Sequence, residues 1–185
     1  MNAPATVRPV RIVVVGGGAG GLELVTQLGK KLGKSGQAEI TLIDSSRQHI
    51  WKPLLHEVAA GTLDSHDDKL EYLAQASDAS FAYQPGEMCG LDREAREVLL
   101  APIEAPDGRE IVPGRRITYD RLVIAVGSGA NDFGTPGAAE HAVPLENVAQ
   151  ASRFHRRLVN ACLRANSQAE AVRPGQLHVA IIGAG

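Results

Sequence analysis

The residues of this chain best suited to chemistry lie in the short sequence GGGAGG, which runs from Gly16 to Gly21. Gly16, Gly18 and Gly21 stand in G-x-G-x-x-G register. In such a loop the first glycine permits a tight turn, the second lets a pyrophosphate approach the backbone, and the third lets a helix pack closely on a strand. The motif alone is weak, because a glycine-rich surface loop has the same composition. The predicted chemistry is anion binding through main-chain N–H groups.

The elements that must position this loop are a strand before it and a helix after it. Ile12 to Val15 is an unbroken run of β-branched residues, typical of a parallel strand buried on both faces. After the loop, apolar residues recur at helical spacing at Leu22, Val25, Leu28 and Leu32. The start of that helix offers free N–H groups and the positive end of its dipole to phosphates. Strand, loop and helix together favour a dinucleotide-binding site over a surface loop.

An acidic residue closes the next predicted strand, Glu39 to Asp44. Asp44 lies 23 positions beyond Gly21 (44 − 21), close to the separation at which a carboxylate accepts hydrogen bonds from both ribose hydroxyls of a dinucleotide. Its negative charge would repel a 2′-phosphate, so the site disfavours NADP. The alternative is that Asp44 caps a turn with Ser45 and Ser46. The strand–glycine–helix–strand order favours the ribose role.

The composition describes an ordinary protein of one domain, or of one domain and part of another. The 185 residues carry a formal net charge of −2 and 44% hydrophobic residues, so there is no basic character of the kind that binds nucleic acid. No apolar run approaches the ~20 residues that a membrane span needs. Met1 to Pro9 lacks the apolar core of a signal peptide and is expected to be a disordered lead-in. Two distant cysteines, Cys89 and Cys162, fit a reducing compartment and a cytoplasmic location.

The middle of the chain contains a distinctive segment and then a series of short strands. The segment HIWKPLLHEVAAGTLD contains His49 and His56, but no further ligand cluster lies near them, so no metal site is predicted. A helix is expected over Ser65 to Ala76. Apolar runs separated by turn sequences then predict an antiparallel β-meander made of Phe81 to Gln84, Glu87 to Leu91, Glu97 to Ala101, Glu110 to Val112 and Ile117 to Tyr119.

The remainder of the chain predicts a buried strand, a long helix and a second glycine motif. Tyr119 to Gly127 is the strand, and Asn147 is expected to cap the helix, whose basic face we interpret as solvated surface. Val179 to Ile182 is another apolar strand run, followed by the G-x-G start Gly183-Ala184-Gly185. The expected organisation is a lead-in over 1–9, a first dinucleotide-binding domain over 10–145, a connecting helix and linker over 146–175, and the first strand of a truncated second Rossmann domain over 176–185.

Two Rossmann starts separated by a meander and by the strand YDRLVIAVG resemble the two-dinucleotide flavoprotein reductases. Within that family, HIWKPLLHEVAAGTLD, VGSGANDFGTPG, Glu140 to Ala142 and Phe154-His155 are similar to the type II NADH dehydrogenases, which are single-subunit NADH:quinone oxidoreductases. The similarity extends from Arg11 to Gly185. It implies an α/β fold in which a Rossmann-like FAD-binding domain, with a parallel sheet and an antiparallel β-meander, precedes an NADH-binding domain.

The resemblance also implies where the cofactor would lie. The FAD pyrophosphate would occupy the loop formed by Gly16, Gly17, Gly18, Ala19, Gly20 and Gly21. Asp44 and Ser45 would contact the adenosine ribose, and Lys52 and Pro53 would lie near the isoalloxazine ring. The backbone of Met88 would face the adenine, and Gly127 would border the pyrophosphate. Gly183 and Gly185 would begin the NADH site. No catalytic acid or base is identified, because the flavin carries the difficult chemistry.

The reaction implied by the resemblance passes a hydride from NADH to the flavin and two electrons from the flavin to a quinone. The second fingerprint stops before its third glycine, so the parts that complete the flavin pocket, line the quinone site and attach to the membrane are expected to be missing. The 185 residues alone are therefore expected not to oxidise NADH. The whole enzyme is expected on the cytoplasmic face of the inner membrane, and the uncovered run Val179 to Ile182 is expected to promote self-association.

Two alternative functions remain open from the sequence. One is a flavin-dependent NAD(P)H reductase whose acceptor is a protein or a soluble molecule. The other is a nucleotide-binding fragment without catalysis.

Overall fold

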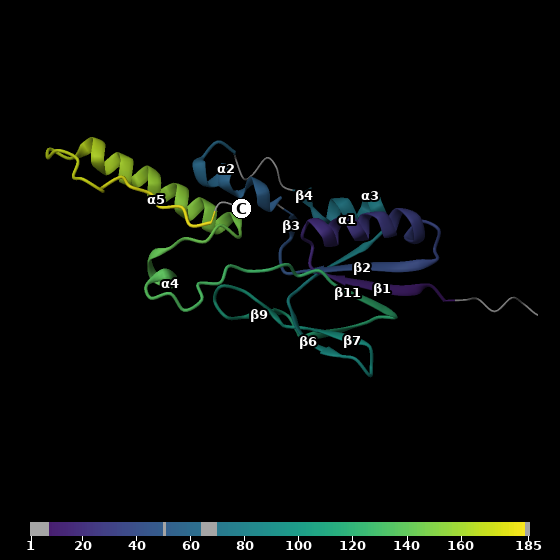
Figure 1. Ribbon diagram of the computed structural model, residues 1–185. Coiled ribbons are helices and arrows are strands. Elements are labelled where there is room, and N and C mark those ends of the chain that lie inside the picture. Colours follow the sequence, from purple (N-terminus) through teal and green to yellow (C-terminus); the bar gives the residue numbers. More distant parts are fainter. Residues whose placement is uncertain (1–7, 50, 64–69, 184–185) are drawn as a thin grey trace, which may run out of the picture. The chain divides into compact units, whose positions relative to one another are not determined.

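The computed structural model describes residues 8–49, 51–63 and 70–183. The chain forms two compact units, one made of Met1–Trp51 with Lys69–Ser128 and the other of Lys52–Asp68 with Gly129–Gly185. The first unit contains the sheets and the glycine loop, whereas the regular structure of the second unit, in its described part, is helical (Figure 1).

Four parallel strands form the central sheet of the first unit, in the order β11-β1-β2-β5. Val14 in β1 lies opposite Leu42 on one side and Val123 on the other. Val13, Val14 and Val15 are all buried, so β1 is covered on both faces, as its β-branched run predicted. The strand bounds are Val10–Val15 (β1), Ala38–Asp44 (β2), Ala82–Pro85 (β5) and Arg121–Ile124 (β11).

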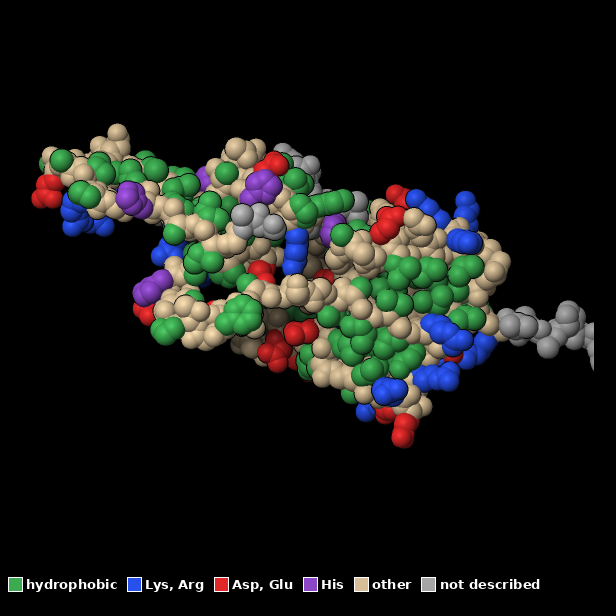
Figure 2. All heavy atoms as spheres, viewed as in Figure 1, with side chains coloured by type: hydrophobic (Ala, Val, Ile, Leu, Met, Phe, Trp, Pro, Cys, Tyr) green, Lys and Arg blue, Asp and Glu red, His purple; other side chains and the backbone are tan. Residues whose placement is uncertain are grey.

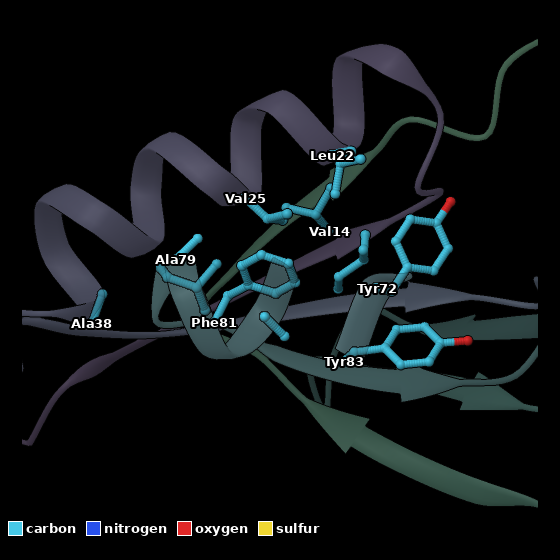
Figure 3. Packing of buried hydrophobic residues seen from close by; sticks show 11 residues of the cluster. Val14, Leu22, Val25, Ala38, Tyr72, Ala79, Phe81 and Tyr83 are labelled. Atoms are coloured by element: carbon cyan, nitrogen blue, oxygen red, sulfur yellow. The ribbon is translucent and has the colours of Figure 1, made fainter. Parts of the chain in front are cut away.

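Two helices cover one face of this sheet. They are α1 (Ala19–Leu28), which continues as a π-helical turn over Gly29–Gly33, and α3 (Tyr72–Ala79). Figure 3 shows side chains from these helices and from the strands meeting in one apolar cluster. Helix, loop and strand are therefore arranged as the glycine motif predicted, and the α/β class is confirmed. The cluster is Val14, Leu22, Val25, Ala38, Ile40, Leu42, Tyr72, Ala76, Ala79, Phe81 and Tyr83.

An antiparallel sheet of three strands covers the other face. Its order is β10-β7-β6, with β6 at Met88–Asp92, β7 at Glu97–Leu100 and β10 at Arg115–Thr118. Val13, Val15 and Ile43 on this face pack with side chains from the antiparallel layer. Two short pairs complete the strands, β8 (Ile103–Glu104) with β9 (Glu110–Val112) and β3 (Gln48–His49) with β4 (Leu70–Glu71). The predicted meander is confirmed for β6, β7 and β10.

The outer strand of the parallel sheet, β11, pairs on one side only among the described residues. Two of the residues at and beyond its end, Ile124 and Val126, are exposed. On the face drawn in Figure 2, hydrophobic side chains gather over the region of β1 and β11. This edge therefore offers unpaired backbone groups beside apolar side chains.

One strand of the predicted meander belongs elsewhere. Phe81 to Gln84 was expected within the antiparallel meander, but β5 joins the parallel sheet beside β2, with Leu42 opposite Tyr83. The reason is topological: α3 lies between the two strands and returns the chain in the same direction, which requires a parallel pairing. A four-residue strand contains too little periodicity to reveal which sheet it joins.

The helix expected over Ser65 to Ala76 is placed differently in the structure. Residues 64–69 lie outside the described part, so the expected start of this helix stays a prediction. In the described part, Leu70–Glu71 pairs as a strand with Gln48–His49, and the helix occupies Tyr72–Ala79. Tertiary pairing therefore overrides the local helical pattern at Leu70 and Glu71.

In the second unit, a short helix packs against a long one. Lys52–Leu54 forms a 3₁₀ turn before α2 (Leu55–Ala60), and α5 (Val148–Ser167) begins at the predicted cap, where Asn147 Oδ1 accepts the Gln150 N–H at 3.0 Å. Leu55, Val58 and Ala59 of α2 and Ala151 of α5 are buried. A third helix, α4, spans Ala138–His141. None of the helices in the described ranges has both the length and the apolarity needed to cross a membrane.

The strand expected at Val179 to Ile182 is not formed. These residues have no ladder partner in the described part of the chain, and Ile181 and Ile182 are 85% and 93% exposed. An apolar run becomes a strand only when other backbone groups complete its hydrogen bonds. The assignment of 176–185 to a second Rossmann domain stays a prediction, and Gly185 lies outside the described residues.

Candidate dinucleotide-binding site

The glycine loop begins with a turn that only glycine fits. Gly16 has φ +103° and donates its N–H to the Ile43 carbonyl at 2.8 Å. A Cβ atom at Gly16 would lie 2.4 Å from the Ala125 carbonyl oxygen. Both the left-handed backbone and this close approach exclude a side chain. The first glycine therefore tightens the turn between β1 and α1, as predicted.

The second and third glycines of the motif differ sharply in their surroundings. A Cβ atom at Gly21 would lie 1.9 Å from the Gly16 carbonyl oxygen, so this glycine is required for the helix to pack on the strand end. A Cβ atom at Gly18 would meet nothing within 4 Å, and the same holds at Gly20. Gly18 has an ordinary φ of −60°. Neither packing nor backbone conformation explains a glycine at position 18, whereas close approach of a ligand does.

The N-terminus of α1 has the features of an anion-binding site. Gly18 is its N-cap residue and makes no side-chain cap, and the first turn contains no acidic residue. The first N–H groups of an α-helix have no partner within the helix, and the dipole makes this end positive. The open space over Gly18 and Gly20 therefore lies beside main-chain donors, which is the environment that a pyrophosphate requires.

Asp44 is hydrogen-bonded to the glycine loop. Its Oδ2 accepts the Gly17 N–H at 2.6 Å, and its Oδ1 accepts the Ser46 N–H at 2.7 Å. The turn cap considered from the sequence is therefore formed at Ser46. An ionised carboxylate has about four acceptor positions, so two backbone bonds leave capacity for ribose hydroxyls. The ribose role of Asp44 and its exposed neighbour Ser45 remains a prediction.

Two tyrosine hydroxyls donate hydrogen bonds to backbone carbonyls of this site, and neither tyrosine was predicted from the sequence. Tyr72 Oη donates to the Gly17 carbonyl at 2.7 Å, and Tyr83 Oη donates to the Ser46 carbonyl at 2.6 Å. Burial, with the nearby Asp44 carboxylate, raises the pKa of both hydroxyls, so they remain protonated donors. Nothing local marks Tyr72, since its role depends on a contact 55 residues away in sequence. One signal for a role at this site was that two of the three tyrosines in the chain lie on elements next to it, Tyr72 in α3 and Tyr83 in β5.

The remaining predicted site residues fall into two groups. Gly127 follows β11 with φ +72°, two residues beyond Ala125, whose carbonyl lies against Gly16. Met88 opens β6 three residues after Pro85, which pairs with Asp44. These residues share a unit with the glycine loop. The second unit contains Lys52 and Pro53, which are exposed in the 3₁₀ turn, and Gly183, which has φ +82°.

Within residues 8–49, 51–63 and 70–183, His, Cys, Asp and Glu side chains form no cluster of three that could hold an ion. In the described part of the chain, the single ion pair of His56 joins its Nε2 to Oε1 of the neighbouring Glu57, at 4.0 Å.

A glycine loop between a buried parallel strand and a helix, with a carboxylate at the end of the next strand, defines the Rossmann-type dinucleotide-binding proteins. Residues 10–185 match the family model of the pyridine nucleotide-disulphide oxidoreductases, and the chain belongs to this family. The two cysteines of the chain, Cys89 and Cys162, are both free.

Two similar proteins are both type II NADH:quinone oxidoreductases. The chain is 46% identical over 153 residues to a type II NADH:quinone oxidoreductase from Haemophilus influenzae, covering 83% of this chain and 34% of that protein. It is 31% identical over 148 residues to a protein of the same name from Staphylococcus aureus, covering 80% of this chain and 34% of that protein. The chain thus spans about a third of the length of the curated relatives it matches.

Solved structures share the fold at low identity. An NDH2 from Plasmodium falciparum superposes with a TM-score of 0.73 at 18% identity, covering 89% of this chain and 31% of that one. A sulfide:quinone oxidoreductase from Aquifex aeolicus superposes with a TM-score of 0.65 at 23% identity, covering 85% of this chain and 33% of that one. Both likenesses confirm the predicted α/β fold of the Rossmann type.

Proposed function

We propose that this chain is the FAD-binding portion of an oxidoreductase that passes electrons from NADH through FAD to a quinone. The observation that supports the cofactor is the open space at Gly18, where a glycine stands beside helix N–H donors without a packing reason. The observation that supports the reaction is the 46% identity to a type II NADH:quinone oxidoreductase.

The residues of this chain would each bind or orient one part of the cofactor. Main-chain donors of Gly18, Ala19 and Gly20 would hold the pyrophosphate, with Gly127 beside it. Asp44 and Ser45 would accept and donate hydrogen bonds at the ribose. The fixed negative charge of Asp44 would select against a phosphate at the 2′ position.

Three further assignments rest on the resemblance alone. The Met88 backbone would face the adenine, and Lys52 with Pro53 would lie near the isoalloxazine ring. The bound flavin would supply hydride acceptance and two-electron transfer, while the protein supplies orientation and electrostatics. Gly183 and Gly185 would contribute to the NADH site, and the whole enzyme would act at the cytoplasmic face of the inner membrane.

Flavin binding is tested by adding FAD to the purified 185-residue chain and removing free cofactor. A retained visible flavin spectrum supports the proposal, and Gly18→Val serves as the matched variant that should lose it. Binding of NAD in place of FAD at this loop would contradict the cofactor assignment.

The acceptor is tested separately. NADH-dependent reduction of a short-chain quinone is compared between the 185 residues and a longer polypeptide containing them. Saturable quinone reduction only by the longer chain is expected. Reduction of soluble acceptors without quinone reduction would favour a reductase with a protein or soluble acceptor, and FAD binding without any turnover in the longer chain would favour a non-catalytic nucleotide-binding module.

A further inference from the structure

The peptide that joins Gly17 to Gly18 is held in one orientation by a buried side chain. Tyr72 Oη donates to the Gly17 carbonyl at 2.7 Å, and the tyrosine is 2% exposed. A trans peptide is planar, with its carbonyl and its N–H pointing in opposite directions. Because the Gly17 carbonyl points at the buried Tyr72 hydroxyl, the Gly18 N–H of the same peptide points away from Tyr72. A Cβ atom at Gly18 would meet nothing within 4 Å, so there is open space at this residue for a ligand.

We infer that Tyr72 is a positioning residue that aims the Gly18 N–H at the pyrophosphate of the bound dinucleotide. This inference rests on the proposed dinucleotide-binding function of the loop and adds a residue that the glycine motif does not contain. Tyr72 would touch no part of the cofactor. Its effect would pass through the orientation of one peptide.

Tyr72 is itself fixed from several sides. Its backbone N–H donates to the Arg47 carbonyl at 3.2 Å, which ties the start of α3 to the loop after β2. Its ring lies 5.3 Å from the ring of Tyr83 and 6.5 Å from that of His49. Figure 3 shows Tyr72 and Tyr83 next to each other, with both hydroxyls directed away from the apolar cluster. The hydroxyl therefore has little freedom to leave the Gly17 carbonyl.

The opposite side of Gly17 is also held. Its N–H donates to Asp44 Oδ2 at 2.6 Å, so both peptides that meet at Gly17 have a fixed partner. A Cβ atom at Gly17 would lie 2.3 Å from Tyr72 Oη, which explains a glycine at a position outside the G-x-G-x-x-G register. Gly17 and Tyr72 thus form a matched pair, in which the absent side chain makes room for the hydroxyl.

Donors that are already oriented bind more tightly than donors that must be ordered on binding. Tyr72→Phe removes the hydroxyl and keeps the ring, leaving the Gly17–Gly18 peptide free to rotate. Tyr119→Phe is the matched control: Tyr119 is also buried, at 9% exposed, but it packs in the cluster on the other face of the sheet. Neither substitution removes a residue of the glycine loop.

The experiment measures two quantities in the wild-type chain and in both variants. One is the dissociation constant of FAD. The other is the response of the Gly18 amide in spectra of the [¹⁵N]glycine-labelled chain to inorganic pyrophosphate. Tyr72→Phe is expected to weaken FAD by roughly five- to tenfold, the scale of one hydrogen bond, and to reduce the Gly18 response to pyrophosphate. Tyr119→Phe is expected to leave both quantities unchanged.

The outcomes separate this inference from the proposed function. An equal FAD affinity and an equal Gly18 response in Tyr72→Phe and wild type would overturn the role of Tyr72. The same loss in Tyr119→Phe would overturn it too, because the effect would then be general destabilisation. If FAD does not bind but pyrophosphate shifts Gly18 in a Tyr72-dependent way, the positioning role stands and the FAD assignment fails. If the Gly18 amide fails to respond to pyrophosphate in the wild-type chain and in both variants, the inference is overturned.

Discussion

The carboxylate of Asp44 accepts the Gly17 N–H at 2.6 Å, which links the end of β2 directly to the glycine loop. The two parts of the dinucleotide fingerprint, the glycines and the acidic residue, are therefore connected by a direct hydrogen bond. A substitution of Asp44 therefore removes a hydrogen bond to the glycine loop as well as the acceptor expected for the ribose.

Asp44→Ala is expected to weaken FAD binding by about 1–3 kcal/mol, the scale for hydrogen bonds to a charged group. The substitution removes the acceptors of the Gly17 and Ser46 N–H groups together with the ribose acceptor. Calorimetric titration with FAD measures the change. Asp92→Ala is the control, because among the described residues Asp92 accepts hydrogen bonds from local N–H groups alone, in the turn after β6. Equal FAD affinity in Asp44→Ala and wild type would leave Asp44 as a turn cap alone.

Gly18→Val is expected to abolish flavin retention while the chain stays folded. The added side chain would enter open space, where nothing lies within 4 Å, and φ at this position is −60°. The fold should tolerate it, whereas the pyrophosphate should not. Thermal unfolding and bound-flavin absorbance are measured on the same sample. A folded variant with unchanged flavin occupancy would remove the basis for the proposed site.

Gly21→Val is expected to act through stability instead. Its Cβ would lie 1.9 Å from the Gly16 carbonyl oxygen, a backbone atom that cannot move without displacing the turn. Overpacking of this kind costs typically ~1–3 kcal/mol. Chemical denaturation compares Gly21→Val with Gly20→Val, at whose Cβ position nothing lies within 4 Å. Equal unfolding free energies for the two variants would contradict this packing role of Gly21.

Acid should destabilise the chain partly through Asp120. Arg11 and Arg8 hold the pKa of this carboxyl below its ordinary value of 3.8, with Arg8 Nη2 at 2.8 Å and Arg11 Nη2 at 3.2 Å from Oδ1. Because the folded pKa is depressed, the ion pairs stabilise the fold above that ordinary value and are lost as the pH falls below it.

Asp120→Asn tests this linkage. The variant should be less stable than wild type at neutral pH, and the difference should shrink as the pH falls below about 4. Unfolding midpoints at a series of pH values give the comparison. Asp107→Asn is the control, since in the described part of the chain Asp107 accepts a hydrogen bond only from the nearby Arg109 N–H. A difference that stays constant with pH would show that charge at Asp120 is not the cause.

The exposed run near residue 180 should promote self-association. Ile181 and Ile182 are 85% and 93% exposed and follow another exposed apolar residue, Val179. Light scattering is expected to show oligomers that diminish in Ile181→Lys/Ile182→Lys. Ser152→Lys/Asn160→Lys adds the same charge on the exposed surface of α5 and should not change association. A monomeric wild-type chain would refute the expectation.

The sequence predicted the elements with strong periodicity and missed those whose role depends on distant contacts. Ile12 to Val15, the helix after Gly18 and the Asn147 cap are all present, because each has a local cause. The pairing of β5 with β2 and the strand at Leu70–Glu71 depend on partners far along the chain, so local pattern could not reveal them. An apolar run also implied a strand at Val179 to Ile182, where the described chain offers no partner.

The same distinction applies to the site. Gly16, Gly18 and Gly21 have the separate environments that the motif requires. The sequence places Tyr72 only within the helix expected over Ser65 to Ala76, because the residues near a tyrosine carry no signal of a contact with Gly17. The turn cap and the link to the glycine loop at Asp44 coexist, which spacing alone could not show.

The pairing of Ile12 with Arg121 has a consequence for how the protein is made. The central strand β1 leaves the ribosome before its neighbour β11, which is synthesised 109 residues later (121 − 12). Until then one edge of an apolar strand remains open, and the Ala125 carbonyl that packs on Gly16 does not yet exist. Parallel pairing over such a separation is slow and exposes the chain to aggregation. Folding of the first unit should therefore wait until β11 has been synthesised, and until then the nascent chain would benefit from protection by a chaperone.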